Sequence, residues 1–321
     1  QGGGDDQVMP STAAILEGAP VILADGAIET RLIYEFGLPT HDFSSFVHLF
    51  TPEGRAALDA IYRGYMRVAG DSRLPMQVGT PTWRAHPEGL ARQGFAAPDD
   101  LRRVNEEAFR FLAGMREELG LDDLVMIAGV IGPRRDGYDP SVAPEAAEAE
   151  AYHRPQAQVL ADLGVDLLYA PTFVSAQELL GVARAMAATG LPYALAPVID
   201  DDARLIDGTP LDAAIAAIDD AASPPPSQYL IGCTHAVHVT RAQGSPNWPA
   251  NGRVAGLKAN ASPLPPSELD RLDHLEQDDP ETFADGLAKL HAGGMRFLGG
   301  CCGTGEAHIA ALARRLIAEP A

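Results

Sequence analysis

The sequence has little cysteine, only three residues among 321: Cys233, Cys301 and Cys302. Three thiols cannot form a complete set of disulfides, and neighbouring cysteines rarely bridge each other. This small number argues against a secreted protein that is held together by disulfides. We therefore expect reduced thiols and a cytoplasmic protein, where clustered cysteines serve more often as metal ligands or catalysts.

Long hydrophobic runs are also missing. No stretch approaches the roughly 18 apolar residues that a membrane helix needs, so we expect no membrane partner. The first fourteen residues lack both the basic start and the apolar segment of a secretory signal. We expect residues 1–14 to be a flexible N-terminal tail and residues 15–321 to form the folded domain.

Positive charge is scarce, with 24 Lys and Arg against 44 Asp and Glu and a formal net charge of −20. Nucleic-acid binding draws most of its affinity from neutralised phosphates and needs a basic surface, so we exclude it. The acidic residues are scattered along the chain, which is typical of a solvated surface. The partners should therefore be small molecules, and either a monomer or a homo-oligomer is compatible with the sequence.

What the sequence does contain is a regular alternation of short apolar segments and amphipathic ones. Its length allows one large barrel or two smaller domains. The segments expected to be strands are 21–25, 75–79, 124–130, 165–170, 193–199, 228–233, 254–259 and 295–299. The segments expected to be helices are 52–69, 99–119, 143–163, 176–188, 211–221, 236–242, 280–290 and 307–318.

Eight strand–helix units in about 300 residues predict an α/β fold, a single (β/α)8 TIM barrel with its active site at the C-terminal ends of the strands. Parallel pairing through right-handed crossovers follows from the alternation. The alternative is an open, doubly wound sheet. Since no GxGxxG follows the first strand and no P-loop occurs, a nucleotide-binding sheet is disfavoured.

All three cysteines follow predicted strands: Cys233 ends the sixth, and Cys301 and Cys302 come after the eighth. In a parallel barrel these ends share one face. Three thiolates with one open position are typical of a catalytic Zn²⁺ site. The alternative is that they are small buried core residues, a common fate of cysteine. Their placement on one face favours the metal site.

The residues around the cysteines carry a family resemblance. The motifs are DGA at 25–27, GVIGP at 129–133, YHRPQ at 152–156, DGTP at 207–210, IGC at 231–233, Asn260 and GGCCGT at 299–304. Together and in this order they resemble the homocysteine S-methyltransferase family, over residues 20 to 317. GGCC with an upstream cysteine at a strand end is the specific part of this pattern.

The resemblance implies a barrel in which Cys233, Cys301 and Cys302 bind Zn²⁺ and are the catalytic residues, while the substrate thiol takes the fourth position. A free thiol has a pKa of about 8.5, and zinc coordination deprotonates it at neutral pH. The thiolate then attacks a methyl group on a sulfonium or ammonium donor, such as S-methylmethionine, S-adenosylmethionine or betaine. Homocysteine as the acceptor would give methionine.

The same resemblance implies substrate contacts from Asp25, Gly26, Thr172 and Asn260, with Asp25 at the amino group of the acceptor. The alternative for Asp25 is a helix cap or a loop hydrogen bond. His235 follows Cys233 closely and is a candidate for a substrate contact. If it bound the metal instead, as a fourth protein ligand, the site would be closed and structural.

Two positions depart from the family pattern. Pro171 stands where the family carries a glutamate that binds the amino group, and proline cannot pair with an ammonium. The acceptor is then either a thiol without an α-amino group or one bound through another acid, such as Asp200 or Asp201. Trp83 stands near an aromatic position of the family; it either stacks on the methylated cation or packs under a loop.

Three hypotheses follow. The first is the zinc-dependent thiol methyltransferase. The second keeps the barrel and the zinc but acts on a different thiol or demethylates another sulfonium compound. The third is a non-catalytic protein that binds zinc or a thiol, from which product formation distinguishes the other two.

Overall fold

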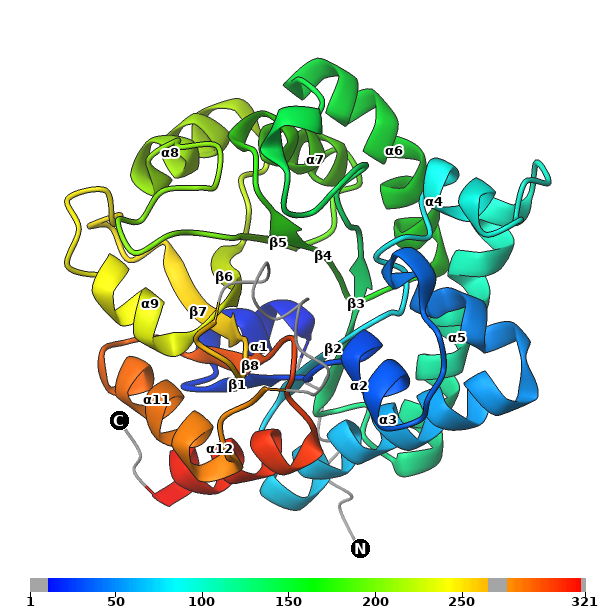
Figure 1. The fold of residues 1–321 in the computed structure, drawn as a ribbon, viewed down its shortest axis with the longest axis horizontal. Helices are drawn as coiled ribbons and strands as arrows, with labels where there is room; N and C mark the ends of the chain where they lie inside the picture. The colour runs from blue at the N-terminus through cyan, green and yellow to red at the C-terminus, as the bar shows by residue number, and fades with distance from the viewer. Residues whose placement is uncertain (1–10, 265–275, 319–321) are drawn as a thin grey trace, which may run out of the picture.

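The computed structural model describes residues 11–264 and 276–318, and its centre is a closed barrel of parallel strands (Figure 1). The strands are β1 (Ile22–Ala24), β2 (Met76–Gly79), β3 (Val125–Val130), β4 (Leu167–Phe173), β5 (Tyr193–Pro197), β6 (Gln228–Thr234), β7 (Val254–Ala259) and β8 (Phe297–Gly300). Each pairs with the next in sequence, and β8 pairs with β1. This confirms the predicted single (β/α)8 barrel.

The strands are mostly apolar because both of their faces are buried. Side chains on the inner face, among them Ala24, Met126, Leu167, Leu230 and Phe297, form one cluster inside the barrel. Side chains on the outer face join a larger cluster with the surrounding helices. Parallel sheets that are covered on both sides have this pattern, which is why the strands lack polar alternation.

The helices that follow the strands surround the barrel as an outer ring (Figure 1). They are α3 (Pro52–Ser72), α5 (Asp100–Leu119), α6 (Ala146–Leu163), α7 (Ala176–Ala187), α8 (Leu211–Ala221), α9 (Ala236–Ala242), α11 (Pro280–Ala292) and α12 (Glu306–Ala318). All eight expected helices occur. Their ends follow local chemistry: Thr51 accepts a hydrogen bond from Gly54 N at the start of α3, and Gly120 and Gly164 end α5 and α6 with positive φ.

Helix α1 (Thr12–Gly18) corrects the expected boundary of the N-terminal tail. Three residues assigned to the tail, 12–14, are helical, because the Ser11 side chain accepts a hydrogen bond from Ala14 N. Leu16 packs into the cluster inside the barrel, and Arg296 donates hydrogen bonds to the carbonyl oxygens of Leu16 and Ala19. Residues 1–10 of the expected tail lie outside the described residues.

Several short elements fill loops that lead away from the strand ends. They are α2 (Glu29–Tyr34), η1 (His41–Phe43), η2 (Ser45–Phe50), α4 (Pro87–Arg92) and η3 (Pro140–Val142). One or two helical turns are too short for a periodic pattern, so the sequence did not predict them. Within the described parts of the chain, no helix has the length and apolar character that crossing a bilayer requires.

Candidate functional site

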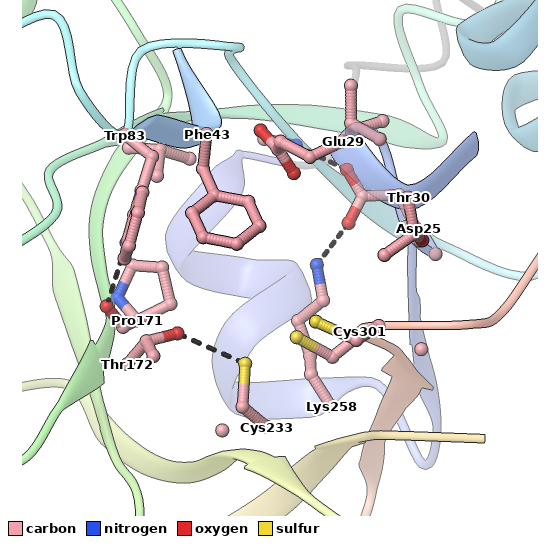
Figure 2. Close-up of a pocket in the computed structure, with 18 of the residues that line it drawn as sticks. Asp25, Glu29, Thr30, Phe43, Trp83, Pro171, Thr172, Cys233, Lys258 and Cys301 are labelled. Atoms are coloured by element: carbon pink, nitrogen blue, oxygen red, sulfur yellow. Dashed lines mark hydrogen bonds and ion pairs between the residues drawn. The ribbon is translucent and has the colours of Figure 1, made fainter. Parts of the chain in front are cut away.

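A cavity of about 130 Å³ opens at the C-terminal ends of the strands (Figure 2). Its described lining comes from β1, β2, β3, β4, β6, β7 and β8 and from the loops that follow them. Polar and reactive side chains gather here, including the three cysteines, two carboxylates and a lysine. The active face that the barrel topology predicts is therefore the face that carries this chemistry.

The three cysteine sulfurs lie together, all within 4.8 Å of one another. Cys233 comes from the end of β6, and Cys301 and Cys302 follow β8, with only β7 between the two strands. Sulfurs that share a tetrahedral Zn²⁺ at about 2.3 Å lie about 3.8 Å apart. The three thiols thus fit a metal ion after small side-chain adjustments, and they are unbridged.

Cys233 points into the cavity because the backbone is bent at that residue. Its φ is 47°, in the left-handed region, and the pairing of β6 with β7 shifts register across it. Thr172 on β4 has the same feature, with φ of 66° and a register shift against β5. Bulges of this kind redirect side chains next to active sites. The two redirected side chains meet, with Thr172 Oγ1 3.1 Å from Cys233 Sγ.

The loop that carries Cys301 and Cys302 is fixed by the GGCCGT motif. A Cβ on Gly299 or Gly300 would collide with Ala24 or Thr304, so glycine is required at both positions. Thr304 Oγ1 donates a hydrogen bond to Cys301 O (2.7 Å) and accepts one from Ala27 N (3.1 Å). These bonds tie the cysteine loop to the end of β1.

The thiols influence one another's protonation. The pKa of Cys233 lies well below its ordinary value, because Cys301 and Cys302 donate hydrogen bonds to its thiolate. The same contact raises the pKa of Cys301 to about 12, because its proton is held by Cys233. The pKa of Cys302 is likewise raised well above its usual range by Cys233.

Asp25, at the end of β1, lies in the cavity and is held on both oxygens. Oδ1 accepts a hydrogen bond from Lys258 Nζ, with which it forms an ion pair, and Oδ2 accepts one from Gly79 N at 2.8 Å. In Figure 2 the Lys258 ammonium lies between the Asp25 carboxylate and the cysteine sulfurs. Nothing in the sequence analysis singled out Lys258; the available signal is a lone lysine near the end of an otherwise apolar strand.

Glu29 and Tyr169 are further cavity residues that the sequence analysis missed. Burial raises the pKa of Glu29, and Ser45 Oγ donates a hydrogen bond of 2.6 Å to its Oε1. Burial also raises the pKa of Tyr169 well above 10, so the side chain remains a neutral phenol. Its buried hydroxyl has no hydrogen-bond partner among the described residues.

Two aromatic rings border the cavity, Trp83 from the loop after β2 and Phe43 from η1 (Figure 2). Their centroids are 6.3 Å apart with planes at 83°. Trp83 Nε1 donates a hydrogen bond to Pro171 O (3.2 Å), so the proline contributes its carbonyl where no carboxylate is present. Phe43 is 41 % exposed and has a φ of 53°, an unusual conformation for a bulky residue.

Of the remaining residues that were expected to contact the substrate, only some line the cavity. Gly26 lines the cavity, and a Cβ there would come within 2.6 Å of Tyr65 Oη. Asn260 is not in the described lining but donates from Nδ2 to Cys233 O (2.9 Å). His235 is in neither the cavity lining nor the cysteine group, and both of its ring nitrogens are engaged: Nε2 contacts Asp278 Oδ2 (2.9 Å) and Nδ1 caps α9. This arrangement does not support His235 as a metal ligand or a substrate contact.

The suggestion that Asp200 or Asp201 binds the amino group of the acceptor is not supported either. Neither residue belongs to the described lining of the cavity. Asp201 contacts His238 and Arg241, while Asp200 Oδ1 accepts hydrogen bonds from the backbone of Asp202 and Arg204. These acids stabilise the loop after β5.

Comparison with known proteins identifies the family of the chain and agrees with the fold. The family model described as homocysteine S-methyltransferase matches residues 22–316. Homocysteine S-methyltransferase of Escherichia coli (strain K12) is 26 % identical over 323 residues, covering 94 % of this chain and 97 % of that protein. Homocysteine S-methyltransferase YbgG of Bacillus subtilis (strain 168) is 25 % identical over 327 residues, covering 93 % and 95 %.

Solved structures share the fold. The metallated form of the homocysteine methyltransferase MmuM from Escherichia coli superposes with a TM-score of 0.74 at 24 % identity, covering 94 % of this chain and 98 % of that one. The oxidized form of the same protein gives a TM-score of 0.75 with the same identity and coverage. At this identity the likeness establishes the barrel.

Proposed function

Because the chain belongs to the homocysteine S-methyltransferase family, we propose that it moves a methyl group from a cationic donor to a thiol in a zinc-dependent reaction. Membership makes the chain a methyltransferase, which removes the non-catalytic hypothesis. The acceptor, the donor and the metal are the parts that we propose. The observation that carries the proposal is the group of three cysteine sulfurs within 4.8 Å at the cavity.

Cys233, Cys301 and Cys302 would hold the metal. Three sulfur ligands suit Zn²⁺, and a three-residue set leaves one position for an incoming group, as catalytic zinc sites do. When bound, Zn²⁺ lowers the pKa of a thiol and holds the thiolate in place. Thr172 Oγ1 and Asn260 Nδ2 support Cys233 at its sulfur and at its carbonyl oxygen, so both fix the direction of one ligand.

The acceptor we propose is homocysteine, which gives methionine as product. Its sulfur must reach the cysteine group, and its polar end then lies near Asp25, Glu29 and Lys258, which line the same cavity. In the transfer, a new S–C bond forms between the acceptor sulfur and the methyl carbon. The old bond from that carbon to the donor breaks, and its electron pair stays with the leaving group. The acceptor thiol has released its proton to solvent beforehand.

The donor we propose is a sulfonium or quaternary ammonium compound of the S-methylmethionine, S-adenosylmethionine or betaine type. Trp83 and Phe43 lie at the cavity border, and the faces of aromatic rings bind methylated cations. Because the donor cation becomes neutral as the methyl group leaves, no strong general acid is needed. The apolar border also keeps water from competing for the methyl group.

The location we propose is the cytoplasm. Three unbridged cysteines so close together need a reducing compartment to stay available as thiolates. The partners are then small molecules, the thiol and the methyl donor.

A methyl-transfer assay that crosses acceptors with donors tests the proposal. Zinc-loaded protein is incubated with homocysteine, cysteine or a simple alkane thiol, each with S-methylmethionine, S-adenosylmethionine or betaine. We expect methionine from homocysteine with at least one donor. Loss of a methyl group from a donor without added thiol would instead favour demethylation of a sulfonium compound. No product from any pair would refute the proposed function.

A further inference from the structure

Two polar groups in the cavity have hydrogen-bond donors that no described residue accepts. Lys258 Nζ carries three N–H donors, and Asp25 is its only hydrogen-bond acceptor among the described residues. The Tyr169 side chain is 2 % exposed, and its hydroxyl has no described partner. Buried polar groups without partners are costly, and at a cavity they indicate the position of a ligand.

These two groups are neighbours. Lys258 Nζ lies over the Tyr169 ring, 5.7 Å from its centroid, and both side chains line the cavity that holds the cysteines. Lys258 comes from β7, between the strands that carry the cysteines, and Tyr169 comes from β4 across the barrel. A ligand bound between them therefore lies next to the sulfurs.

The two groups are donors. The positive charge of Lys258 is paired with Asp25, but the ammonium keeps N–H donors that no described residue accepts. Lys258 is the only basic residue among the described residues that line the cavity. The nearby Arg134 is already paired with Glu88 and Glu148, and Arg84 donates to the carbonyl oxygens of Pro133 and Arg135. An anionic group on a substrate therefore finds one cationic side chain in the described lining, Lys258.

An ammonium group finds a less favourable environment. Both oxygens of Asp25 already accept hydrogen bonds, one from the Lys258 ammonium, which would repel a second cation. Glu29 is partly buried, and its Oε1 already accepts a hydrogen bond from Ser45 Oγ. Pro171 offers no side-chain acceptor.

We propose that Lys258 Nζ and Tyr169 Oη bind the carboxylate of the acceptor thiol, so that the enzyme selects thiol carboxylates and does not require an α-ammonium group. This rests on the proposed function and defines the substrate class of the same site. Homocysteine belongs to this class because it carries both groups. The carboxylate stays unchanged in the reaction, and the methyl group moves to sulfur as described above.

Three thiols that differ by one group test the proposal: homocysteine, 4-mercaptobutanoate, which lacks the amino group, and 3-aminopropane-1-thiol, which lacks the carboxylate. Their binding to the zinc-loaded protein is measured by calorimetry without a donor, under reducing conditions. We expect 4-mercaptobutanoate to bind within about fivefold of homocysteine, and 3-aminopropane-1-thiol to bind at least about tenfold more weakly. Equal or tighter binding of the aminothiol would overturn the proposal.

Tyr169→Phe is the decisive variant, because it removes a hydroxyl that has no partner and should leave folding intact. We expect it to weaken 4-mercaptobutanoate binding about five- to tenfold and to leave the aminothiol unchanged. Tyr62→Phe is the matched control, since Tyr62 also lines the cavity but its hydroxyl donates to Gly79 O at 2.9 Å. In the Tyr62→Phe control, the ratio of the affinities for 4-mercaptobutanoate and the aminothiol should equal the wild-type ratio.

Lys258→Met combined with Asp25→Asn removes both charges and avoids a buried unpaired carboxylate. We expect this double variant to lose the preference for the carboxylate. If Tyr169→Phe keeps the wild-type affinity ratio, the proposal fails, even if the double variant does not fold. Methyl transfer is followed separately: an enzyme that binds these thiols as expected but methylates none refutes the proposed function and leaves the carboxylate site standing.

Discussion

Thr172 Oγ1 lies 3.1 Å from Cys233 Sγ, and both residues have a left-handed backbone, with φ of 66° and 47°. Neither is a glycine, and a β-branched residue in this region is a conformational outlier. Such strain costs of the order of 1–3 kcal/mol and persists where the surrounding structure fixes it, commonly at functional sites. Here two bulges on β4 and β6 hold one cysteine at the cavity.

Thr172→Val should weaken metal binding. The change keeps the branched shape but removes the hydroxyl next to Cys233 Sγ. Loss of a hydrogen bond to a metal ligand raises the metal dissociation constant about 10- to 100-fold. Competition with a chromogenic chelator measures this constant. Thr172→Ser keeps the hydroxyl and serves as the control; equal zinc affinity in all three proteins would show that the contact does not support the metal.

Cys301→Ser and Cys302→Ser should each lose zinc and activity together. The parent protein should hold about one zinc per chain, because three sulfurs lie within 4.8 Å. A hydroxyl is not deprotonated as readily as a thiol and is a poor replacement. Metal analysis after desalting gives the stoichiometry, and Thr189→Ser, in the turn after α7, controls for handling. A parent protein that is fully active without metal would refute the mechanism.

Asp25→Asn should raise the KM for homocysteine by about tenfold or more, since charged hydrogen bonds contribute about 1.5–3 kcal/mol. A comparison of the KM values for homocysteine and 4-mercaptobutanoate distinguishes two roles of Asp25. If Asp25 anchors Lys258, the KM for 4-mercaptobutanoate rises as much as the KM for homocysteine. If Asp25 binds the substrate ammonium, only homocysteine is affected. An unchanged KM for both thiols would remove Asp25 from acceptor binding.

Trp83→Ala and Phe43→Ala should raise the KM for the cationic donor. A cation over an aromatic ring gains about 0.5–2 kcal/mol, which corresponds to roughly a 2- to 30-fold change. Phe43 is 41 % exposed, so its truncation should not harm folding. The KM for the thiol should stay constant in Phe43→Ala. Exposed Phe36 is 37 % accessible and does not line the cavity, so Phe36→Ala is a suitable control.

His86 should make the protein less stable in mild acid. Burial, with a contribution from Arg84, holds its pKa well below 6.5. The unfolded chain then takes up a proton as the pH falls through about 6.5, while the folded protein does not. The free energy of unfolding therefore decreases below that pH by up to about 1.4 kcal/mol per pH unit. Urea unfolding between pH 7 and 5 measures this slope.

His86→Asn should flatten that dependence. His86 Nδ1 accepts a hydrogen bond from Gly89 N (3.1 Å) at the start of α4, and asparagine caps helices in the same way without titrating. Burial also lowers the pKa of His48, so a smaller pH dependence of the unfolding free energy should remain in this variant. Exposed His41 provides the control variant His41→Asn, which should keep the full slope. An unchanged slope in His86→Asn would exclude His86 as the cause.

The fold was predictable from the sequence because its signals are repeated. Each strand is buried on both faces, so it appears as a short apolar run, and glycines such as Gly120 and Gly164 mark the helix ends. The cysteine group was predictable for a related reason, since the ends of parallel strands meet on one face. Helices α2 and α4 escaped prediction because each has only six residues.

The charges around the sulfurs were harder to predict. A lysine near the end of β7 has no local pattern that shows its partner, and Asp25 lies 233 positions away. Whether Glu29 or Tyr169 faces the cavity depends on how the strands and loops pack. The expectation that His235 contacts the substrate came from its nearness to Cys233 in the sequence. In the structure the turn into α9 directs the His235 ring toward Asp278.

Helix α1 packs Leu16 against the inner side chains at the N-terminal end of the barrel, behind the strands in the view of Figure 1. The cysteines lie near the opposite end, where the strands reach their C-terminal ends. The packed interior separates the two ends, so a substrate approaches the sulfurs from the face on which the cavity opens.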